Sequence, residues 1–316
     1  MTDAAIIGAG RSGAERRRMT GVLLLLASGL VASSGGPLFR AIEAATPWQI
    51  LFYRALGMLL VVGLFAWAKA GSRFSAAFGG LGWRGATAAA FLAGASVCYI
   101  VALTLTTVAN TLFLVATAPL VGALLGRAFL GDRVAPVTWL AMACAVGGIG
   151  LMVGDGLASG QLWGNLAGFG AGAGFACFVV ILRGAALNGH TIDANAALCC
   201  GALFGMAIGA TVALGQGSGL ALAPADTTYA IALGALQLGL ALILFTLGAR
   251  YLTAAEAMLL ALVEVVCSPL WTWLIFGERP SDLGLLGGLV LLSGLVVQGA
   301  WGLRRSRPAA VPEILP

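Results

Sequence analysis

Long apolar stretches separated by short polar breaks run along nearly the whole chain. Most stretches are about 20 residues long, which is the length an α-helix needs to cross the hydrocarbon core of a bilayer. The pattern therefore predicts ten membrane-spanning helices with short connections. We place them at residues 19–39, 48–68, 85–105, 108–130, 134–154, 164–185, 194–215, 228–250, 254–276 and 283–303.

The composition agrees with an all-α integral membrane protein. Of the 316 residues, 60% are hydrophobic and 9% are charged, whereas charged residues make up about a quarter of a typical soluble domain. The cysteines all lie in apolar segments, and the single histidine, His190, lies in a polar connection. A metal site or an acid–base catalytic centre has few residues to be built from, so we expect no metal, no cofactor and no enzyme activity.

The basic residues predict the orientation. With ten crossings both termini share a side, and positive charge accumulates on the cytoplasmic side of membrane proteins. The side that holds the termini also gathers almost all the basic residues outside the spans, namely Arg11, Arg16, Arg17, Arg18, Lys69, Arg73, Arg84, Arg127, Arg133, Arg183, Arg250, Arg304, Arg305 and Arg307. The other side has only Arg40 and Arg279, and Arg54 lies within a helix. We expect both termini in the cytoplasm. Because the net charge of +5 is confined to this membrane face, nucleic acid is not an expected partner.

The chain repeats itself weakly. Gly131-Asp132-Arg133 follows the fourth predicted helix, and Gly277-Glu278-Arg279 follows the ninth. The same offset along the chain pairs Thr107 with Thr253 and Leu114 with Leu260, and a similar offset pairs Arg40 with Arg183. Each half then holds five helices, and because five is odd the second half enters the membrane from the opposite side. Inverted repeats of this kind are a frequent plan of secondary carriers.

The halves and their flanks divide the chain into four parts. We expect a cytoplasmic basic tail at residues 1–18, a first five-helix repeat at 19–154, a second at 155–303 and a cytoplasmic tail at 304–316.

Three stretches carry a family pattern. They are PWQILFYR from Pro47 to Arg54, the stretch from Ala102 to Arg133 with Pro119 and its closing Gly-Asp-Arg, and AEAMLLALVEVVCSPLWTWLIFGERP from Ala255 to Pro280. They resemble the drug/metabolite transporter superfamily in its bacterial EamA-type branch. Asp132 stands where the family more often has Glu, which keeps the charge. The resemblance implies ten helices around a central cavity, and a small-molecule substrate moved across the bacterial inner membrane. The overall pattern is most similar to amino-acid exporters of the aromatic amino-acid exporter type.

We therefore expect a secondary transporter that exports small metabolites, most of all amino acids, by alternating access. Three alternatives stay open. The first is a carrier of drugs or other metabolites with the same fold, and the second is a channel, which would lack saturable counterflow. The third, a membrane-embedded enzyme, would need clustered His, Asp or Cys at acid–base or ligand spacing.

Glu264 is the first candidate functional residue. It lies near the middle of the predicted helix 254–276, and a carboxylate at the bilayer centre costs roughly 2.5 kcal/mol or more unless it is paired, protonated or hydrated. Such a group could bind a substrate amine, carry a proton, or form a structural contact between helices. In the repeat it aligns with Ala118, beside Pro119, so only the second half carries the acid.

Arg54 is the second candidate, because a guanidinium can bind a carboxylate with two parallel hydrogen bonds. It could equally hold the bundle together through an acidic side chain, or extend toward the interface. Glu256 lies near the start of its helix, where a carboxylate favours the helix dipole. The expected residues for substrate binding or coupling are Glu264, Arg54, Tyr99, Trp163 and Gln237, the last three as possible lining residues.

Overall fold

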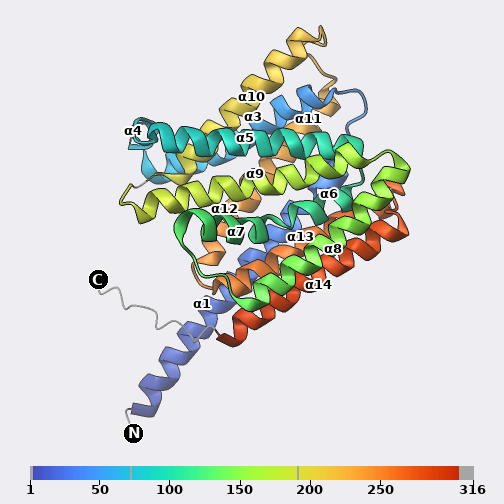
Figure 1. Cartoon of the computed structure of the whole chain (residues 1–316). Coiled ribbons are helices and arrows are strands. Elements are labelled where there is room, and N and C mark those ends of the chain that lie inside the picture. Colours follow the sequence, from blue (N-terminus) through green and yellow to red (C-terminus); the bar gives the residue numbers. More distant parts are fainter. Residues whose placement is uncertain (1–2, 72, 191, 306–316) are drawn as a thin grey trace.

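The protein is a bundle of long helices in a computed structural model that describes residues 3–71, 73–190 and 192–305 (Figure 1). Within these ranges all regular secondary structure is helical. The elements are α1 (Asp3–Ala32), α2 (Gly35–Arg40), α3 (Pro47–Ala70), α4 (Arg73–Gly79), α5 (Gly82–Leu105), α6 (Val108–Val115), α7 (Ala118–Leu130), α8 (Pro136–Ser159), α9 (Leu162–Leu187), α10 (Ala194–Gly215), α11 (Pro224–Ala232), the π-helix η1 (Leu233–Leu240), α12 (Ala241–Ala249), α13 (Ala254–Phe276) and α14 (Asp282–Arg305).

The ten predicted spans are confirmed within the described part of the chain. Ten helical stretches there are long and apolar enough to cross a membrane. They are Glu15–Arg40, Pro47–Ala70, Gly82–Leu105, Val108–Leu130, Pro136–Gly154, Leu162–Leu187, Ala194–Gly215, Pro224–Ala249, Ala255–Phe276 and Asp282–Arg304. One difference lies at the N-terminus, where α1 begins at Asp3, so that most of the segment expected as a tail continues the first span as a helix.

Three of the spans that we predicted as continuous are interrupted. The first breaks at Ser33 and Ser34 between α1 and α2, just before two glycines and Pro37, because glycine and proline are the weakest helix formers. The fourth breaks at Ala116 and Thr117, two residues before Pro119, which has no N–H to donate to the preceding turn. The eighth contains η1, a π-helical segment of 8 residues.

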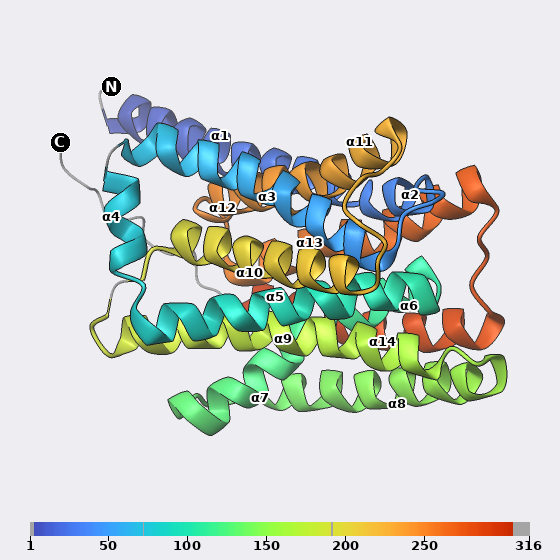
Figure 2. The same ribbon diagram turned by 90° about the horizontal axis from the view of Figure 1, so that it is seen from above.

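Helices that correspond in the two halves pack against each other. The second span (α3) lies on the seventh (α10), and the fifth (α8) lies on the tenth (α14). Span one contacts α12 and α13, and its counterpart α9 contacts α5, α6 and α7. Figure 2 shows the long helices side by side, with both termini and α4 at one end and α2 and α6 at the other. We call these the termini end and the far end.

The fourth and ninth spans begin and end alike. Thr107 accepts a hydrogen bond from the backbone N–H of Asn110 at the start of α6, and Thr253 accepts one from Glu256 at the start of α13. Gly131 ends α7 with φ 73°, and Gly277 ends α13 with φ 68°, a left-handed conformation that glycine adopts without steric cost. The sequence repeat is therefore also a repeat of local structure.

Candidate functional site

Four of the five predicted site residues meet inside the bundle. They come from four elements: Arg54 from α3, Tyr99 from α5, Gln237 from η1 and Glu264 from α13. Arg54, Tyr99 and Gln237 are almost fully buried. We refer to these four residues as the polar cluster.

Gln237 joins the other three members of the polar cluster. Its Oε1 accepts a hydrogen bond from an Nη of Arg54 at 3.3 Å, and its Nε2 donates to the Tyr99 hydroxyl at 2.6 Å and to Glu264 Oε1 at 3.4 Å. The carbonyl thus faces the cation, and the amide N–H groups face the carboxylate. Arg54 and Glu264 are held in one site without a direct ion pair between them, since the ion pairs among the described residues lie elsewhere.

Arg54 has hydrogen-bonding capacity that the protein does not use. Its Nε is buried and has no hydrogen-bond partner among the residues that the structure describes, although an unpaired buried donor costs about 1–3 kcal/mol. The guanidinium carbon lies 4.8 Å from the centre of the Tyr99 ring, a cation–π distance that stabilises the charge. The guanidinium is therefore held in place from one side while part of its donor fork stays free.

Glu264 also has free capacity, as a hydrogen-bond acceptor. It lies on the face of α13 that carries buried Ala257 and Ser268, whereas Val266 and Leu270 on other faces are exposed. Glu264 therefore points into the bundle, yet it keeps some accessible surface. Its one hydrogen bond among the described residues is the long contact to Gln237, so the carboxylate can accept further bonds from an interior guest.

A close approach of two backbones sets the position of Gln237. A Cβ added at Gly234 in η1 would lie 1.7 Å from the carbonyl oxygen of Arg54 in α3. One added at Gly57 in α3 would lie 2.1 Å from the carbonyl oxygen of Ile231, near the end of α11. Only glycine allows α3 to approach η1 and the end of α11 this closely. The sequence shows these glycines but not their partners, so their part in the site was missed.

The short helix α2 covers the polar cluster on its far-end side. A Cβ at Gly35 would lie 2.7 Å from the Gln237 side chain. The next residue, Gly36, donates its N–H to the Ser268 hydroxyl at 3.1 Å. Ser268 lies on α13 one turn after Glu264. The break between α1 and α2 therefore places the start of a helix beside the polar cluster, which the prediction of a continuous span did not anticipate.

Two other residues that the sequence singled out lie outside the polar cluster. Trp163 is at the start of α9, and its side chain is 71% exposed. Glu256 accepts from the backbone N–H of Thr253 at 2.9 Å and from Arg18 at 2.7 Å. It closes the N-terminal turn of α13 and ties that turn to α1, as the helix-dipole interpretation favoured.

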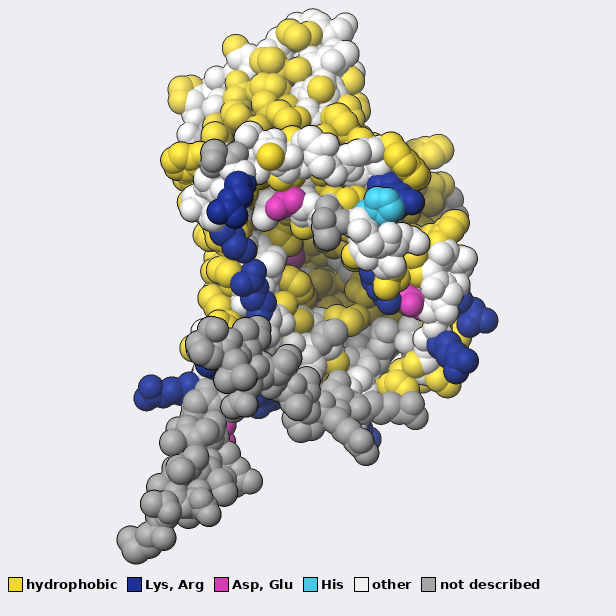
Figure 3. All heavy atoms as spheres, turned by 90° about the vertical axis from the view of Figure 1, so that its left-hand side faces the viewer, with side chains coloured by type: hydrophobic (Ala, Val, Ile, Leu, Met, Phe, Trp, Pro, Cys, Tyr) yellow, Lys and Arg dark blue, Asp and Glu magenta, His cyan; other side chains and the backbone are white. Residues whose placement is uncertain are grey.

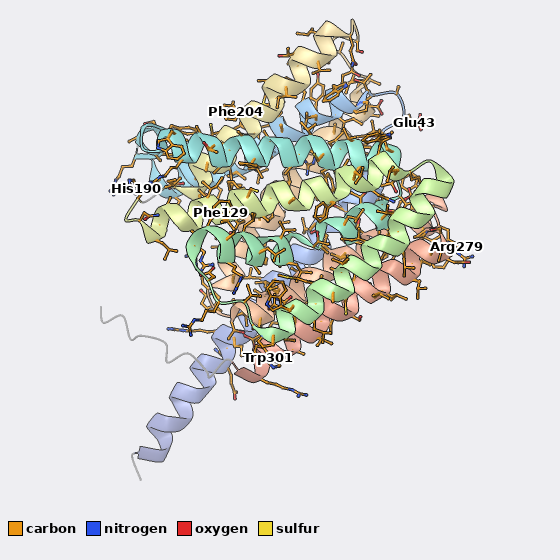
Figure 4. The ribbon with its side chains drawn as sticks, in the orientation of Figure 1. Glu43, Phe129, His190, Phe204, Arg279 and Trp301 are labelled. Atoms are coloured by element: carbon orange, nitrogen blue, oxygen red, sulfur yellow. The ribbon has the colours of Figure 1, made fainter. Side chains whose placement is uncertain are left out.

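The surface at the termini end is hollowed near its centre, with Lys and Arg side chains around the hollow (Figure 3). His190 marks the same end in Figure 4, while Glu43 and Arg279 lie at the far end. Within the described residues no group of three or more His, Cys, Asp or Glu side chains is placed to hold a metal ion. The polar cluster is thus suited to binding a polar guest by charge and hydrogen bonding.

Comparisons with known proteins place the chain in a family. The model of the EamA-like transporter family matches twice, at residues 19–154 and 162–298, which fits an internal duplication. An uncharacterized transporter from Archaeoglobus fulgidus is 34% identical over 73 residues, a match that covers 23% of this chain and 26% of that protein. A solved structure described only as "Crystal structure of protein" has a TM-score of 0.64 at 17% identity, covering 91% of this chain and 98% of the other. That likeness concerns the fold alone.

The two family matches together span most of the chain, and the polar cluster lies within them. The chain therefore belongs to the EamA-like transporter family, and it is a multi-pass membrane transporter of the drug/metabolite type.

Proposed function

We propose that the protein is a secondary transporter that exports amino acids across the bacterial inner membrane by alternating access. The observation that carries the proposal is the arrangement of the polar cluster. A buried cation with a free donor and a carboxylate with free acceptors share one site, and an amide separates them.

A zwitterionic α-amino acid is complementary to this arrangement. Its carboxylate can accept from the Nε and an Nη of Arg54, and its ammonium can donate to Glu264. Bidentate binding of a carboxylate is the geometry for which the guanidinium fork is suited. Gln237 keeps the two protein charges from neutralising each other, so that the substrate completes both pairs.

The electrostatics favour a substrate with both charges. A buried charge is costly unless a partner of opposite sign compensates for its lost hydration. A substrate with a single charge would compensate either Arg54 or Glu264 and leave the other group under-satisfied. Selectivity then follows from the difference between a guest that completes both contacts and one that completes a single contact.

The orientation of the bundle supports export. Both termini and almost all the basic residues outside the spans belong to one end, which the positive-inside rule makes the cytoplasmic end. The hollow in the surface lies at that end (Figure 3), so a cytoplasmic substrate meets the open side first. The inverted repeat supplies the means of reversing access, because the two halves can exchange conformations.

The proposal is tested by counterflow in proteoliposomes. Vesicles loaded with one unlabelled compound are diluted into the same compound carrying a label, across a panel of amino acids, nucleosides and cationic drugs. We expect saturable uptake of label driven by an internal amino acid. Saturable counterflow of drugs or nucleosides without amino acids would replace the substrate class, and flux without saturation or counterflow would indicate a channel.

A further inference from the structure

The far end of the bundle is closed by an ion pair that also binds the opposite group of helices. Arg40, the last residue of α2, pairs with Glu278, which follows α13. Arg40 also donates to the carbonyl oxygens of Leu103 at 2.8 Å and Thr106 at 3.1 Å, and Glu278 accepts from the backbone N–H of Val108 at 2.6 Å. We call this set of contacts the far lock.

The termini end has a second ion pair at the repeat-related position. Arg183 near the end of α9 corresponds to Arg40, and Asp132 after α7 corresponds to Glu278. Arg183 donates two hydrogen bonds to Asp132, at 2.6 Å and 3.0 Å. The repeat is thus preserved in charge, in pairing and in position at a helix end.

The loop that the far lock binds also has a counterpart. The segment 103–108 between α5 and α6 corresponds to the segment 249–254 between α12 and α13. Thr107 in the first segment and Thr253 in the second each accept from the N–H three residues later. The second segment therefore starts its helix in the same way as the one that Arg40 and Glu278 bind.

The two ends differ in whether the ion pair is hydrogen-bonded to the backbone of the neighbouring loop. In the far lock the side chains of Arg40 and Glu278 are 25% and 19% exposed, against 55% and 31% for Arg183 and Asp132. Among the described residues, Arg183 donates hydrogen bonds to Asp132 alone. The ion pair that binds its loop is at the far end. The ion pair Arg183–Asp132, which does not bind segment 249–254, is at the termini end, where the surface is hollowed (Figure 3).

We propose that Arg183 and Asp132 form the gate that closes the termini end in the alternate state. In that state Arg183 donates to the carbonyl oxygens of Ala249 and Leu252, and Asp132 accepts from the backbone N–H of Ala254. These are the repeat-related counterparts of the contacts in the far lock. The inference rests on the proposed alternating-access function, and it names the residues that carry out one half of the cycle.

The chemistry of the pair supports this exchange. A guanidinium has five N–H donors, and Arg183 uses one on each of two Asp132 oxygens, which leaves others for carbonyl groups. Opening the far lock and closing the other gate then trades one set of backbone contacts for an equivalent set. The two states stay close in free energy, which a carrier that visits both of them needs.

The far lock is also coupled to the polar cluster. The helix α2 has 6 residues, with Gly35 packed against Gln237 at its start and Arg40 in the far lock at its end. A substrate that shifts Gln237 would therefore move the helix that carries Arg40. Glu278 of the far lock follows the end of α13, and segment 249–254 of the proposed gate leads into its start. A movement of α13 would therefore reach the gate at the termini end as well.

The gate is tested by a distance measurement that does not depend on transport. Spin labels are placed at Arg133→Cys and Tyr251→Cys, which flank the proposed gate, in a chain whose native cysteines are replaced by alanine or serine. Pulsed electron–electron double resonance then gives the distribution of distances between the two labels in the reconstituted protein. We expect a long distance for the open state and a shorter one for the closed gate.

Two single variants have opposite expected effects. Arg40→Gln weakens the far lock, so the short-distance population should rise by about fivefold relative to the long one for each hydrogen bond lost. Arg183→Gln should remove the short-distance population. The proposal is overturned if neither variant changes the distribution, or if both shift it in the same direction.

A charge exchange separates a gate from a simple brace between α7 and α9. In the double variant Asp132→Arg with Arg183→Asp, the ion pair can re-form, but a carboxylate at position 183 cannot donate to the carbonyl groups of segment 249–254. We expect no short-distance population in this variant. Its return to wild-type levels would show that pairing alone matters, which overturns the gate.

Failure of the gate and failure of the proposed function give different results. Counterflow of amino acids with an unresponsive distance distribution rejects the gate and keeps the function. A responsive distribution without amino-acid counterflow keeps the gate and rejects the substrate class.

Discussion

The fourth span (α6 and α7) and the ninth span (α13) are counterparts in the two halves, and they differ most at their centres. Both begin with a threonine cap and end with a left-handed glycine. The fourth is interrupted at Ala116 and Thr117, whereas α13 runs unbroken past Glu264. At the offset that pairs their ends, Glu264 corresponds to Ala118. The two spans therefore begin and end alike and differ in the middle, where α13 carries Glu264 of the polar cluster.

The same asymmetry extends to other members of the polar cluster. At that offset Gln237 corresponds to Phe91, and Tyr99 corresponds to Phe245. Phe91 is 42% exposed on the outside of α5, so it does not form a second cluster in the opposite half. Helix breaks, which carriers use to direct helix ends at their guests, occur in α1–α2 and α6–α7 of the first half. Their counterparts α9 and α13 are continuous.

The largest effect is expected from removing the acid that distinguishes α13. Glu264→Gln keeps the size of the side chain and deletes the charge that we assign to the substrate ammonium. Loss of one partner of a buried charge pair costs about 2 kcal/mol or more, or roughly thirtyfold. Initial rates of counterflow should fall at least that far. The control is Glu43→Gln, at an exposed carboxylate of the far end, and a Glu264→Gln protein as active as this control would contradict the assignment.

A smaller effect is expected from changing the cation of the polar cluster. Arg54→Lys keeps the charge but replaces a planar donor fork with a point charge. We expect the apparent affinity for amino acids to fall about tenfold, or about 1.4 kcal/mol, with the folded yield close to that of wild type. The affinity is measured from the concentration dependence of counterflow, beside the control substitution Arg73→Lys at an exposed position in α4. A loss of folded yield with unchanged affinity would assign Arg54 to structure instead.

Disturbing the close contact between η1 and α3 should lower the thermal stability of the protein. Gly234 corresponds to Ala88 in α5, but a methyl group at Gly234 would collide with the carbonyl of Arg54. Overpacking of this kind costs about 1–3 kcal/mol, so Gly234→Ala should lower the midpoint of thermal unfolding in detergent. In Gly63→Ala the added Cβ meets its nearest neighbour at 3.9 Å, and its midpoint should not fall. Equal midpoints for the two variants would count against the close contact.

The smallest effects are expected at the ends that the two spans share. Thr107→Val and Thr253→Val each remove a side-chain oxygen that caps a helix, which costs about 1 kcal/mol. The two variants should lower the unfolding midpoint by similar amounts. A cost several times larger at one position would show that the caps are not equivalent.

The spans and the repeat were predictable because apolar length and polar breaks are read directly from the residues. Turn residues such as Gly131 and Gly277 marked the ends correctly. Charge within the membrane also pointed to Arg54 and Glu264, since buried charge is rare and costly. That Gln237 and Tyr99 join them depends on which helix faces meet, so the sequence offered them only as possible lining residues beside Trp163.

The interruptions were not predicted, because an apolar run looks the same whether its helix is continuous or broken. Ser33, Ser34 and the following glycines were weak signals that apolar length outweighed. The π-helical segment that contains Gln237 lies where Gly234 packs closely against α3, and a tertiary contact of this kind is not visible in the sequence. Its sequence carries no proline and resembles any other membrane helix.

The central claim is that Arg54 and Glu264 bind the two charges of one substrate. The most direct test compares competition against counterflow by an amino acid, by its decarboxylated amine and by its deaminated acid, in wild type and in Glu264→Gln. In wild type the amino acid should compete far better than either analogue. In Glu264→Gln this advantage over the deaminated acid should disappear, because the ammonium has lost its partner. An unchanged preference for the amino acid in Glu264→Gln would contradict the claim.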